Sequence, residues 1–141
     1  RFGLVRFLKS GLVDGEPLKA TASLAPDTCS PVIGGDRVFA TAYGEMYCLD
    51  LKDNLKTVWI AENDMFFDHS NVIGGNGRVL VWTQSGDLLS LDAAPNEFKP
   101  LRRLRPFGDG KVDSMSHPAI VGNRLYLRGP GELACFDLSK K

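Results

Sequence analysis

The stretch that decides the fold runs from residue 30 to residue 51 and reads SPVIGGDRVFATAYGEMYCLDL. A second copy, HPAIVGNRLYLRGPGELACFDL, occupies residues 117–138 without a gap, a shift of 87 positions. A third copy with small insertions lies between them at residues 70–93 and reads SNVIGGNGRVLVWTQSGDLLSLDA. The chain is therefore a repeat array, a property that predicts architecture more directly than activity.

A regular spacing runs through the three copies. A turn glycine recurs at intervals of 42 and 45 residues, and an aspartate near the end of each copy repeats the same intervals. These residues are Gly44, Gly86 and Gly131, followed by Asp50, Asp92 and Asp137. A period of about 40 to 45 residues made of short strands is typical of a β-propeller blade rather than of a helical solenoid.

Within each copy, runs rich in β-branched and aromatic residues alternate with glycine turns. In the first copy the pattern predicts strands at residues 31–33, 37–40 and 45–49, the first two joined by the tight Gly-Gly-Asp turn at 34–36. The later copies repeat the second and third strands at residues 78–81, 87–91, 124–127 and 132–136. A fourth, more variable strand is expected at residues 55–60 and 100–104, and at 17–23 for a partial first repeat. Helical apolar spacing is not sustained anywhere in the sequence.

We therefore predict an all-β fold made of β-propeller blades of four antiparallel strands, about three and a third blades forming an incomplete propeller. Residues 1–28 should be the end of a preceding blade, residues 29–67 and 68–112 two blades, and residues 113–141 a partial final blade. Closed propellers have about four to eight blades. We therefore expect the remaining blades to come from a longer parent chain or from another copy of this chain.

Several short sequence segments of the repeat resemble those of one family of propellers. They are residues 30–33 (SPVI), 37–39 (RVF), 44–50 (GEMYCLD) and Trp59. Over nearly the whole chain they resemble the PQQ-like repeats, which include the quinoprotein alcohol dehydrogenases and the outer-membrane assembly lipoproteins of the BamB type. The usual segment of that family, Asp-x-x-Thr-Gly-x-x-x-Trp, lacks its Thr-Gly pair after Asp50, and no tryptophan follows Asp92. These departures argue against a catalytic quinoprotein role.

Composition excludes several classes of function. The 141 residues are 43% hydrophobic and 24% charged, which is typical of a folded globular domain. Seventeen basic residues balance seventeen acidic ones, so no overall field attracts nucleic acid or an acidic membrane surface. No apolar run reaches the roughly eighteen residues of a spanning helix. The basic run at residues 99–105 is interpreted as a solvated outer strand, with an acidic protein partner as the alternative.

The candidate binding residues are those that precede the innermost strand of each blade, because this position faces the central channel of a propeller. They are Cys29, Ser30, Asp68, His69, Ser70, Ser116 and His117. A metal site built from His69, His117 and Asp68 is conceivable, since imidazole and carboxylate at one rim can converge on a cation. Their spacing matches no recognised ligand motif. We therefore predict no metal site and interpret the rim residues as groups that hydrogen-bond neighbouring blades and hydrate the channel.

Two further residue types are assigned structural roles. The aspartates at the end of each copy occur once per repeat at one position, so turn capping is a better account than acid–base catalysis. The cysteines Cys29, Cys48 and Cys135 are expected to be buried thiols rather than a disulfide. Phe66, Phe67, Trp59 and Trp82 are expected to pack between blades.

The sequence thus favours a non-catalytic propeller segment that serves as a protein-binding or assembly scaffold. The resemblance implies a periplasmic or other extracytoplasmic location, and no cofactor, nucleic acid or membrane span is expected. The alternative implied by the same resemblance is a part of a PQQ-dependent quinoprotein oxidoreductase. Such an enzyme would bind PQQ with Ca²⁺ and act on an alcohol or a sugar.

Overall fold

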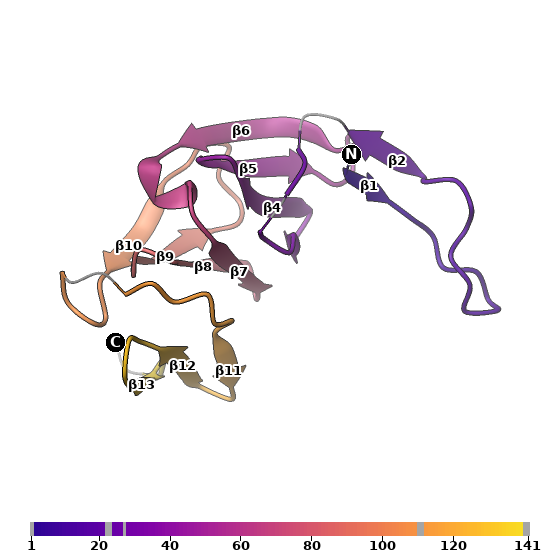
Figure 1. The fold of residues 1–141 in the computed structure, drawn as a ribbon. Coiled ribbons are helices and arrows are strands. Elements are labelled where there is room, and N and C mark those ends of the chain that lie inside the picture. The colour runs from indigo at the N-terminus through magenta and orange to yellow at the C-terminus, as the bar shows by residue number, and fades with distance from the viewer. Residues whose placement is uncertain (1, 22–23, 27, 110–111, 140–141) are drawn as a thin grey trace.

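The computed structural model describes residues 2–21, 24–26, 28–109 and 112–139. Its strands form four separate antiparallel sheets, none of which closes on itself. The sheets follow one another along an arc, with the N-terminal sheet at one end and the C-terminal sheet at the other (Figure 1). The fold is therefore all-β and is an open part of a propeller, as predicted.

Two of the sheets have four strands each, and in both the strands are ordered as they occur along the chain. The first contains β3 (Val32–Gly34), β4 (Arg37–Ala42), β5 (Glu45–Asp50) and β6 (Lys56–Glu62). The second contains β7 (Ser70–Gly75), β8 (Arg78–Thr83), β9 (Leu88–Asp92) and β10 (Pro100–Leu104). A short 3₁₀ helix, η1 (Asp64–Phe66), lies in the connection between them.

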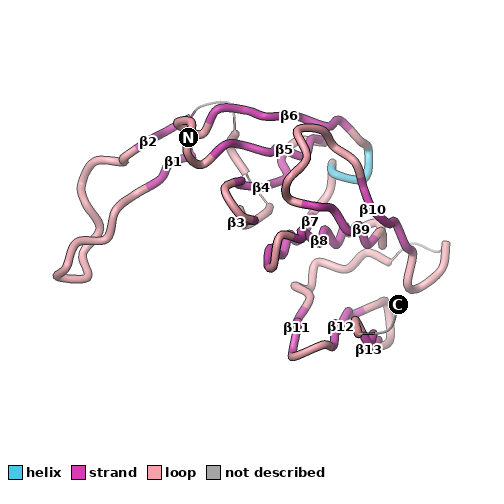
Figure 2. Tube along the Cα trace, turned by 180° about the vertical axis from the view of Figure 1, so that it is seen from behind, coloured by secondary structure: helices cyan, strands magenta, loops and turns pink. Residues whose placement is uncertain are grey.

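The two sheets at the ends of the arc are smaller. At the N-terminal end, β1 (Phe2–Leu4) pairs with β2 (Lys19–Thr21), and the hairpin between them extends away from the first four-stranded sheet (Figure 2). At the C-terminal end, β11 (Ala119–Val121), β12 (Arg124–Arg128) and β13 (Leu133–Asp137) form a three-stranded sheet.

The predicted strands correspond closely to the observed ones. The strand expected at 17–23 is present as β2, although residues 22 and 23 lie outside the described part of the chain. The strand expected at 87–91 begins one residue later, at Leu88. Asp87 instead belongs to the preceding turn, where its backbone N–H donates to Thr83 Oγ1 at 3.0 Å.

Adjacent sheets share hydrophobic cores. Phe39, Met46 and Leu49 of the first four-stranded sheet are buried in one cluster with Val79 and Leu89 of the second. A smaller cluster of Trp82, Val112, Leu125 and Leu127 joins the second sheet to the three-stranded one. The second complete sheet thus contacts a neighbour on each side, and the core that it shares with the first explains why β4 and β5 are apolar along nearly their whole length.

The inner strands of the two complete sheets approach each other very closely at one glycine. A Cβ atom at Gly74 would lie only 2.7 Å from the backbone oxygen of Ile33 in β3. Only a residue without a side chain fits there. The glycine in β7 therefore sets the distance between the inner edges of the two sheets.

The part of the chain that the structure describes contains no helix with the length and apolar character needed to cross a membrane.

Candidate functional site

Strand pairing shows which residues of the three repeats are equivalent at the predicted channel rim. The last pair before each tight turn is Gly34 with Arg37, Gly75 with Arg78, and Val121 with Arg124. Counting back from these arginines, the equivalent rim residues are Ser30, Asn71 and His117, preceded by Cys29, Ser70 and Ser116. The predicted set is displaced by one residue in the middle repeat. The sequence alignment matched Gly34 with Gly74, whereas the strand pairing makes Gly34 equivalent to Gly75.

This displacement changes which side chains share a face. Successive side chains of a strand point to opposite faces, so a shift of one residue exchanges them. His69 is therefore not equivalent to His117. The equivalent of His117 is Asn71, a buried residue that the sequence analysis did not select.

The other predicted rim residues differ widely in exposure. Cys29 is buried and its thiol contacts the Ser30 carbonyl oxygen at 3.4 Å, whereas Ser30 and Asp68 are exposed. Ser70 is completely buried, and its hydroxyl has no hydrogen-bond partner among the described residues. The seven predicted residues therefore range from fully buried to exposed.

The polar groups of the rim mainly connect one sheet to the next. Asn71 donates from its side-chain amide to the backbone oxygen of Ser116, just before the three-stranded sheet, at 3.3 Å. Gln84 accepts from the backbone N–H of His69 at 3.2 Å and donates through its side-chain amide to the carboxylate of Asp113. The contacts of Asn71 and Gln84 with Ser116 and Asp113 reach the segment that leads into the three-stranded sheet, whereas the contact of Gln84 with His69 lies within the β7–β8 hairpin.

A metal centre does not form from the residues that the structure describes. Within the described ranges, no three side chains of His, Cys, Asp or Glu lie together in a way that would hold a metal ion. The imidazole of His117 is exposed, and its Nδ1 lies 3.0 Å from the carbonyl oxygen of the next residue, Pro118. Nε2 of His69 is buried and has no partner among the described residues.

The aspartates at the end of each repeat cap turns, as predicted. Asp50 Oδ1 accepts from the backbone N–H groups of Lys52 at 2.8 Å and Asp53 at 3.0 Å. Asp92 accepts in the same way from Ala94, and Asp137 from Ser139. The backbone N–H groups of Asp53 and Lys52, together with the nearby Arg37 guanidinium, hold the pKa of the Asp50 carboxyl below its usual value.

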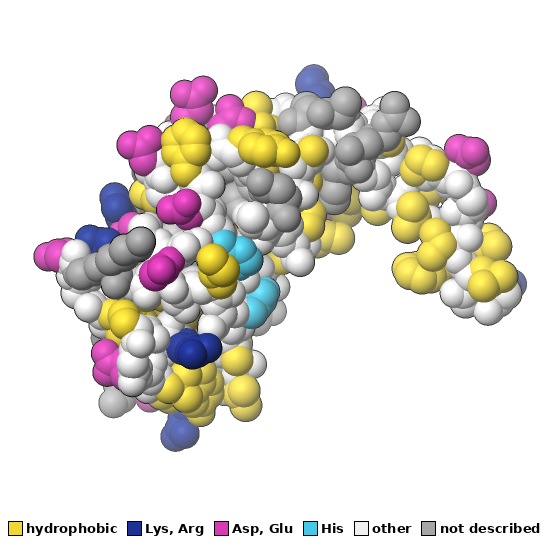
Figure 3. Space-filling view, viewed as in Figure 1, with side chains coloured by type: hydrophobic (Ala, Val, Ile, Leu, Met, Phe, Trp, Pro, Cys, Tyr) yellow, Lys and Arg dark blue, Asp and Glu magenta, His cyan; other side chains and the backbone are white. Residues whose placement is uncertain are grey.

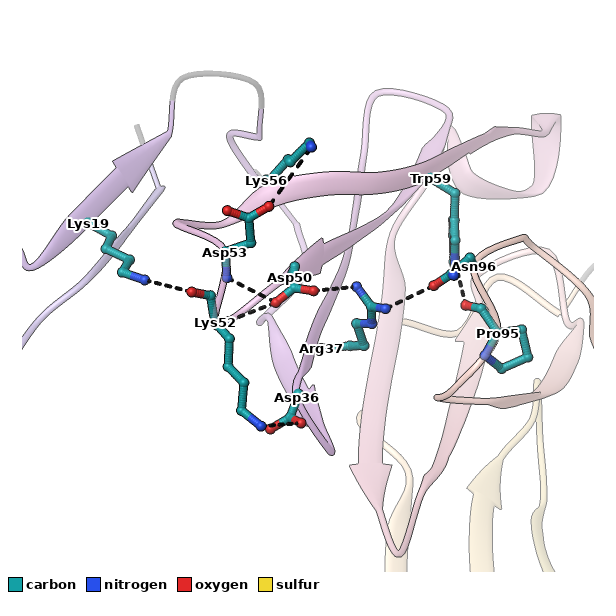
Figure 4. A network of polar contacts seen from close by, with 10 residues as sticks. All are labelled: Lys19, Asp36, Arg37, Asp50, Lys52, Asp53, Lys56, Trp59, Pro95 and Asn96. Carbon is teal, nitrogen blue, oxygen red and sulfur yellow. Dashed lines mark hydrogen bonds and ion pairs between the residues drawn. The ribbon is translucent and has the colours of Figure 1, made fainter.

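Arg37 gives Asp50 a second role that the sequence analysis missed (Figure 4). Its Nη1 lies 2.8 Å from Asp50 Oδ2, while its Nη2 donates to Asn96 Oδ1 on the following sheet at 2.9 Å. Beside it, Trp59 Nε1 donates to the backbone oxygen of Pro95 at 3.3 Å. The arginine that opens the second strand of the repeat therefore links the capped turn to the β9–β10 loop of the next blade.

The basic run at 99–105 is partly neutralised inside its own blade. Asp87 is only 2% exposed, and its Oδ1 lies 2.8 Å from Arg103 Nε and 3.7 Å from Arg105 Nε. A buried carboxylate requires such partners. Lys99 and Arg102 are exposed. The predicted solvated outer strand is present, but two of its arginines fix the adjacent turn.

The cysteines and aromatic residues require two corrections. All three cysteines are free, and burial raises the pKa of the Cys48 thiol to about 11, which makes it unreactive near neutral pH. Cys135 was predicted to be buried but is exposed, because β13 is the edge strand of the last described sheet. Phe67 was predicted to pack between blades but is 69% exposed beside the β4–β5 turn.

Comparison with known proteins gives matches only among solved structures. No protein-family model matches the sequence, and no curated protein matches it. BamB from Moraxella catarrhalis is similar with a TM-score of 0.60 and 25% identity, the match covering 77% of this chain and 33% of that one.

Two quinoprotein dehydrogenases are similar at the level of fold. A quinohemoprotein alcohol dehydrogenase from Comamonas testosteroni has a TM-score of 0.59 and 16% identity over 79% of this chain and 19% of its own. A europium-containing methanol dehydrogenase has a TM-score of 0.57 and 18% identity over 77% of this chain and 22% of its own. The chain thus spans a third of BamB and about a fifth of each dehydrogenase. Its four antiparallel sheets have the fold of a PQQ-like β-propeller repeat segment.

Proposed function

We propose that this chain is a non-catalytic, protein-binding scaffold segment of a larger propeller. The observation that carries this proposal is the pattern of hydrogen bonds at the predicted channel rim. There, the side-chain amides of Asn71 and Gln84 donate to Ser116 and Asp113, just before the three-stranded sheet, rather than converging on a shared point. The likeness to BamB and the resemblance of the repeat to BamB-type assembly lipoproteins support the same function.

The remaining blades are proposed to come from the parent chain or from a second copy of this one. The match to BamB covers only 33% of that protein, so a propeller of similar size would need further blades. An extracytoplasmic location is proposed on the same likeness.

The alternative is a segment of a PQQ-dependent oxidoreductase. PQQ with Ca²⁺ would need several carboxylate or amide oxygens around the cation. Among the described residues, no three acids, histidines or cysteines lie together in a way that would hold a metal ion. This alternative therefore places the cofactor in the remaining blades or across the channel.

The proposal is tested with the full-length parent protein. Affinity capture from its native extract should recover a specific partner in amounts above those on a blank matrix. Recovery of no partner would contradict the scaffold function. In parallel, the protein mixed with Ca²⁺ and PQQ should not reduce an electron-accepting dye when alcohols or sugars are added, and sustained turnover would establish the enzymatic alternative.

A further inference from the structure

One exposed surface of the first complete sheet has the composition of a binding site. It is formed by the β4–β5 turn and the β6–β7 connection, and we call it the aromatic surface. Tyr43 and Phe67 are 66% and 69% exposed, and both rings line an open groove with Glu45, Glu62 and Asp64. Exposed aromatic side chains are enriched at protein interfaces, where they provide large contact areas.

The aromatic surface is held in place by hydrogen bonds beneath it. The N–H of Gly44 donates to the backbone oxygen of Phe66 at 3.2 Å, and the N–H of Asn63 donates to the oxygen of Gly44 at 2.9 Å. Phe66 is buried and packs edge-on against Phe98 with ring centroids 6.1 Å apart. The ring of Phe67 lies over the turn, about 3.0 Å from where a Cβ of Gly44 would be. A partner would therefore meet an ordered surface and lose little entropy in ordering it.

The charge on this surface is negative and is not balanced locally. Glu45 and Glu62 are directly opposite each other in the pairing of β5 with β6, an arrangement that destabilises a sheet. Asp64 and the exposed Asp68 lie in the connection that follows. Ion pairs between described residues involve none of these four carboxylates. Figure 3 shows acidic side chains gathered around hydrophobic ones over η1 and the adjoining end of β6.

The hydroxyl of Tyr47 interacts directly with one carboxylate of this pair. The hydroxyl of Tyr47 donates to Glu45 Oε2. Burial, followed by the hydrogen bond to Glu45 and its charge, raises the pKa of Tyr47 to about 12. The hydroxyl therefore stays protonated near neutral pH and supports the carboxylate as a donor, but it contributes no positive charge.

The second complete sheet shows that the fold does not require this accumulation of charge. There the acid that follows the turn glycine is Asp87, and the outer strand supplies Arg103, whose Nε lies 2.8 Å from it. In the first complete sheet the acid that follows Gly44 is Glu45, and the outer strand supplies Glu62. The second complete sheet thus neutralises the acid at its turn with an arginine. The first places a second acid opposite it, beside two exposed aromatic rings.

We propose that the aromatic surface docks a basic segment of a partner protein, with an arginine side chain placed between Glu45 and Glu62. The guanidinium would neutralise both carboxylates, and its planar face suits the rings of Tyr43 and Phe67. The methylene stem would cover apolar ring surface. The inference rests on the proposed scaffold function and specifies the chemistry of the partner.

The test uses the 141-residue chain and a fluorescent peptide of alternating arginine and serine, followed by fluorescence anisotropy at physiological salt. The double variant Glu45→Gln/Glu62→Gln should weaken peptide binding about tenfold, and Phe67→Ser should weaken it several-fold. The matched control Asp36→Asn/Asp53→Asn removes the same charge from exposed sites elsewhere and should retain binding within about twofold.

Two readouts separate the possible results. Removing the opposed charges should raise the melting temperature of Glu45→Gln/Glu62→Gln, so weaker binding cannot be attributed to unfolding. Equal weakening in both double variants, or in neither, overturns the proposal. In the parent protein, partners that are captured equally by the same double variant would leave the scaffold function intact and exclude this surface. Capture of no partner by the unchanged protein would contradict the scaffold function itself.

Discussion

At the residue scale, the arginine and aspartate of the first complete sheet do more than close a turn. Asp50 accepts two backbone hydrogen bonds and pairs with Arg37, which continues to Asn96 on the next sheet (Figure 4). The charge of one carboxylate therefore contributes both to a local turn and to the contact between blades.

The low pKa of Asp50 predicts a specific dependence of stability on pH. Because the folded-state pKa lies below the ordinary aspartate value of about 3.9, the stabilisation is present above that pH and is lost as pH falls through the folded-state pKa. Asp50→Asn keeps an oxygen that can cap the turn but removes the charge beside Arg37. Thermal unfolding should show the variant to be less stable at pH 7, with the difference from the unchanged protein shrinking toward pH 2. An equal difference at both pH values would contradict this account.

Residue roles were predictable where one residue type repeats at one turn. The capping by Asp50, Asp92 and Asp137 followed from their identical positions. The partner of Asp50 was missed even though arginine also opens each second strand, because the pairing register across a hairpin cannot be read from composition. The exposure of Phe67 depends on how η1 directs the chain, and the hydrophobic pattern does not encode this.

At the element scale, Gly74 and Gly75 form a natural matched pair. A Cβ at Gly74 would lie 2.7 Å from the oxygen of Ile33, whereas a Cβ at Gly75 would contact nothing within 4 Å. Neither glycine has a positive φ angle. Gly74→Ala should therefore lower the free energy of unfolding by about 1 to 3 kcal/mol through overpacking.

Chemical denaturation of both variants provides the measurement. Gly75→Ala should change the free energy of unfolding by less than about 0.5 kcal/mol, as for an ordinary surface substitution. Similar losses in the two variants would mean that the close approach of β3 and β7 does not limit the packing of the two sheets.

The strands were more predictable than the rim that they position. Alternating β-prone runs and glycine turns are sufficient to predict β3 to β6 and their antiparallel order. The rim residues of the middle repeat were misaligned because the two Gly-Gly pairs are not equivalent. Gly35 is the first residue of its two-residue turn, whereas Gly75 is the last residue of the strand before the turn. An alignment error of one residue matters in a strand, because it exchanges the side chains assigned to the two faces of the sheet.

At the scale of the whole molecule, exposed apolar side chains gather at the two ends of the arc (Figure 3). Phe7 and Leu12 are exposed in the N-terminal hairpin, and Val121 and Leu133 in the last sheet. Apolar patches of this kind are typical of surfaces that another chain or domain covers.

The isolated chain should therefore self-associate reversibly as its concentration rises. Sedimentation velocity should show a weight-average mass that increases toward about twice that of the monomer. Val121→Lys/Leu133→Lys should suppress the increase. Ile60→Lys/Leu101→Lys, which alters exposed apolar residues on the outer strands, should leave it unchanged. A mass that is independent of concentration, or equally affected by both variants, would contradict the prediction.

The order of the strands also has a consequence for how the protein folds during synthesis. Every described ladder joins strands that follow one another along the chain, so each sheet can form once its own residues are available. At about 5 to 20 residues per second, the roughly 40 residues of the next sheet take about 2 to 8 s to be made. For that interval the core side chains of β4 and β5 that face the next sheet are uncovered, and a chaperone can bind them before the next blade does.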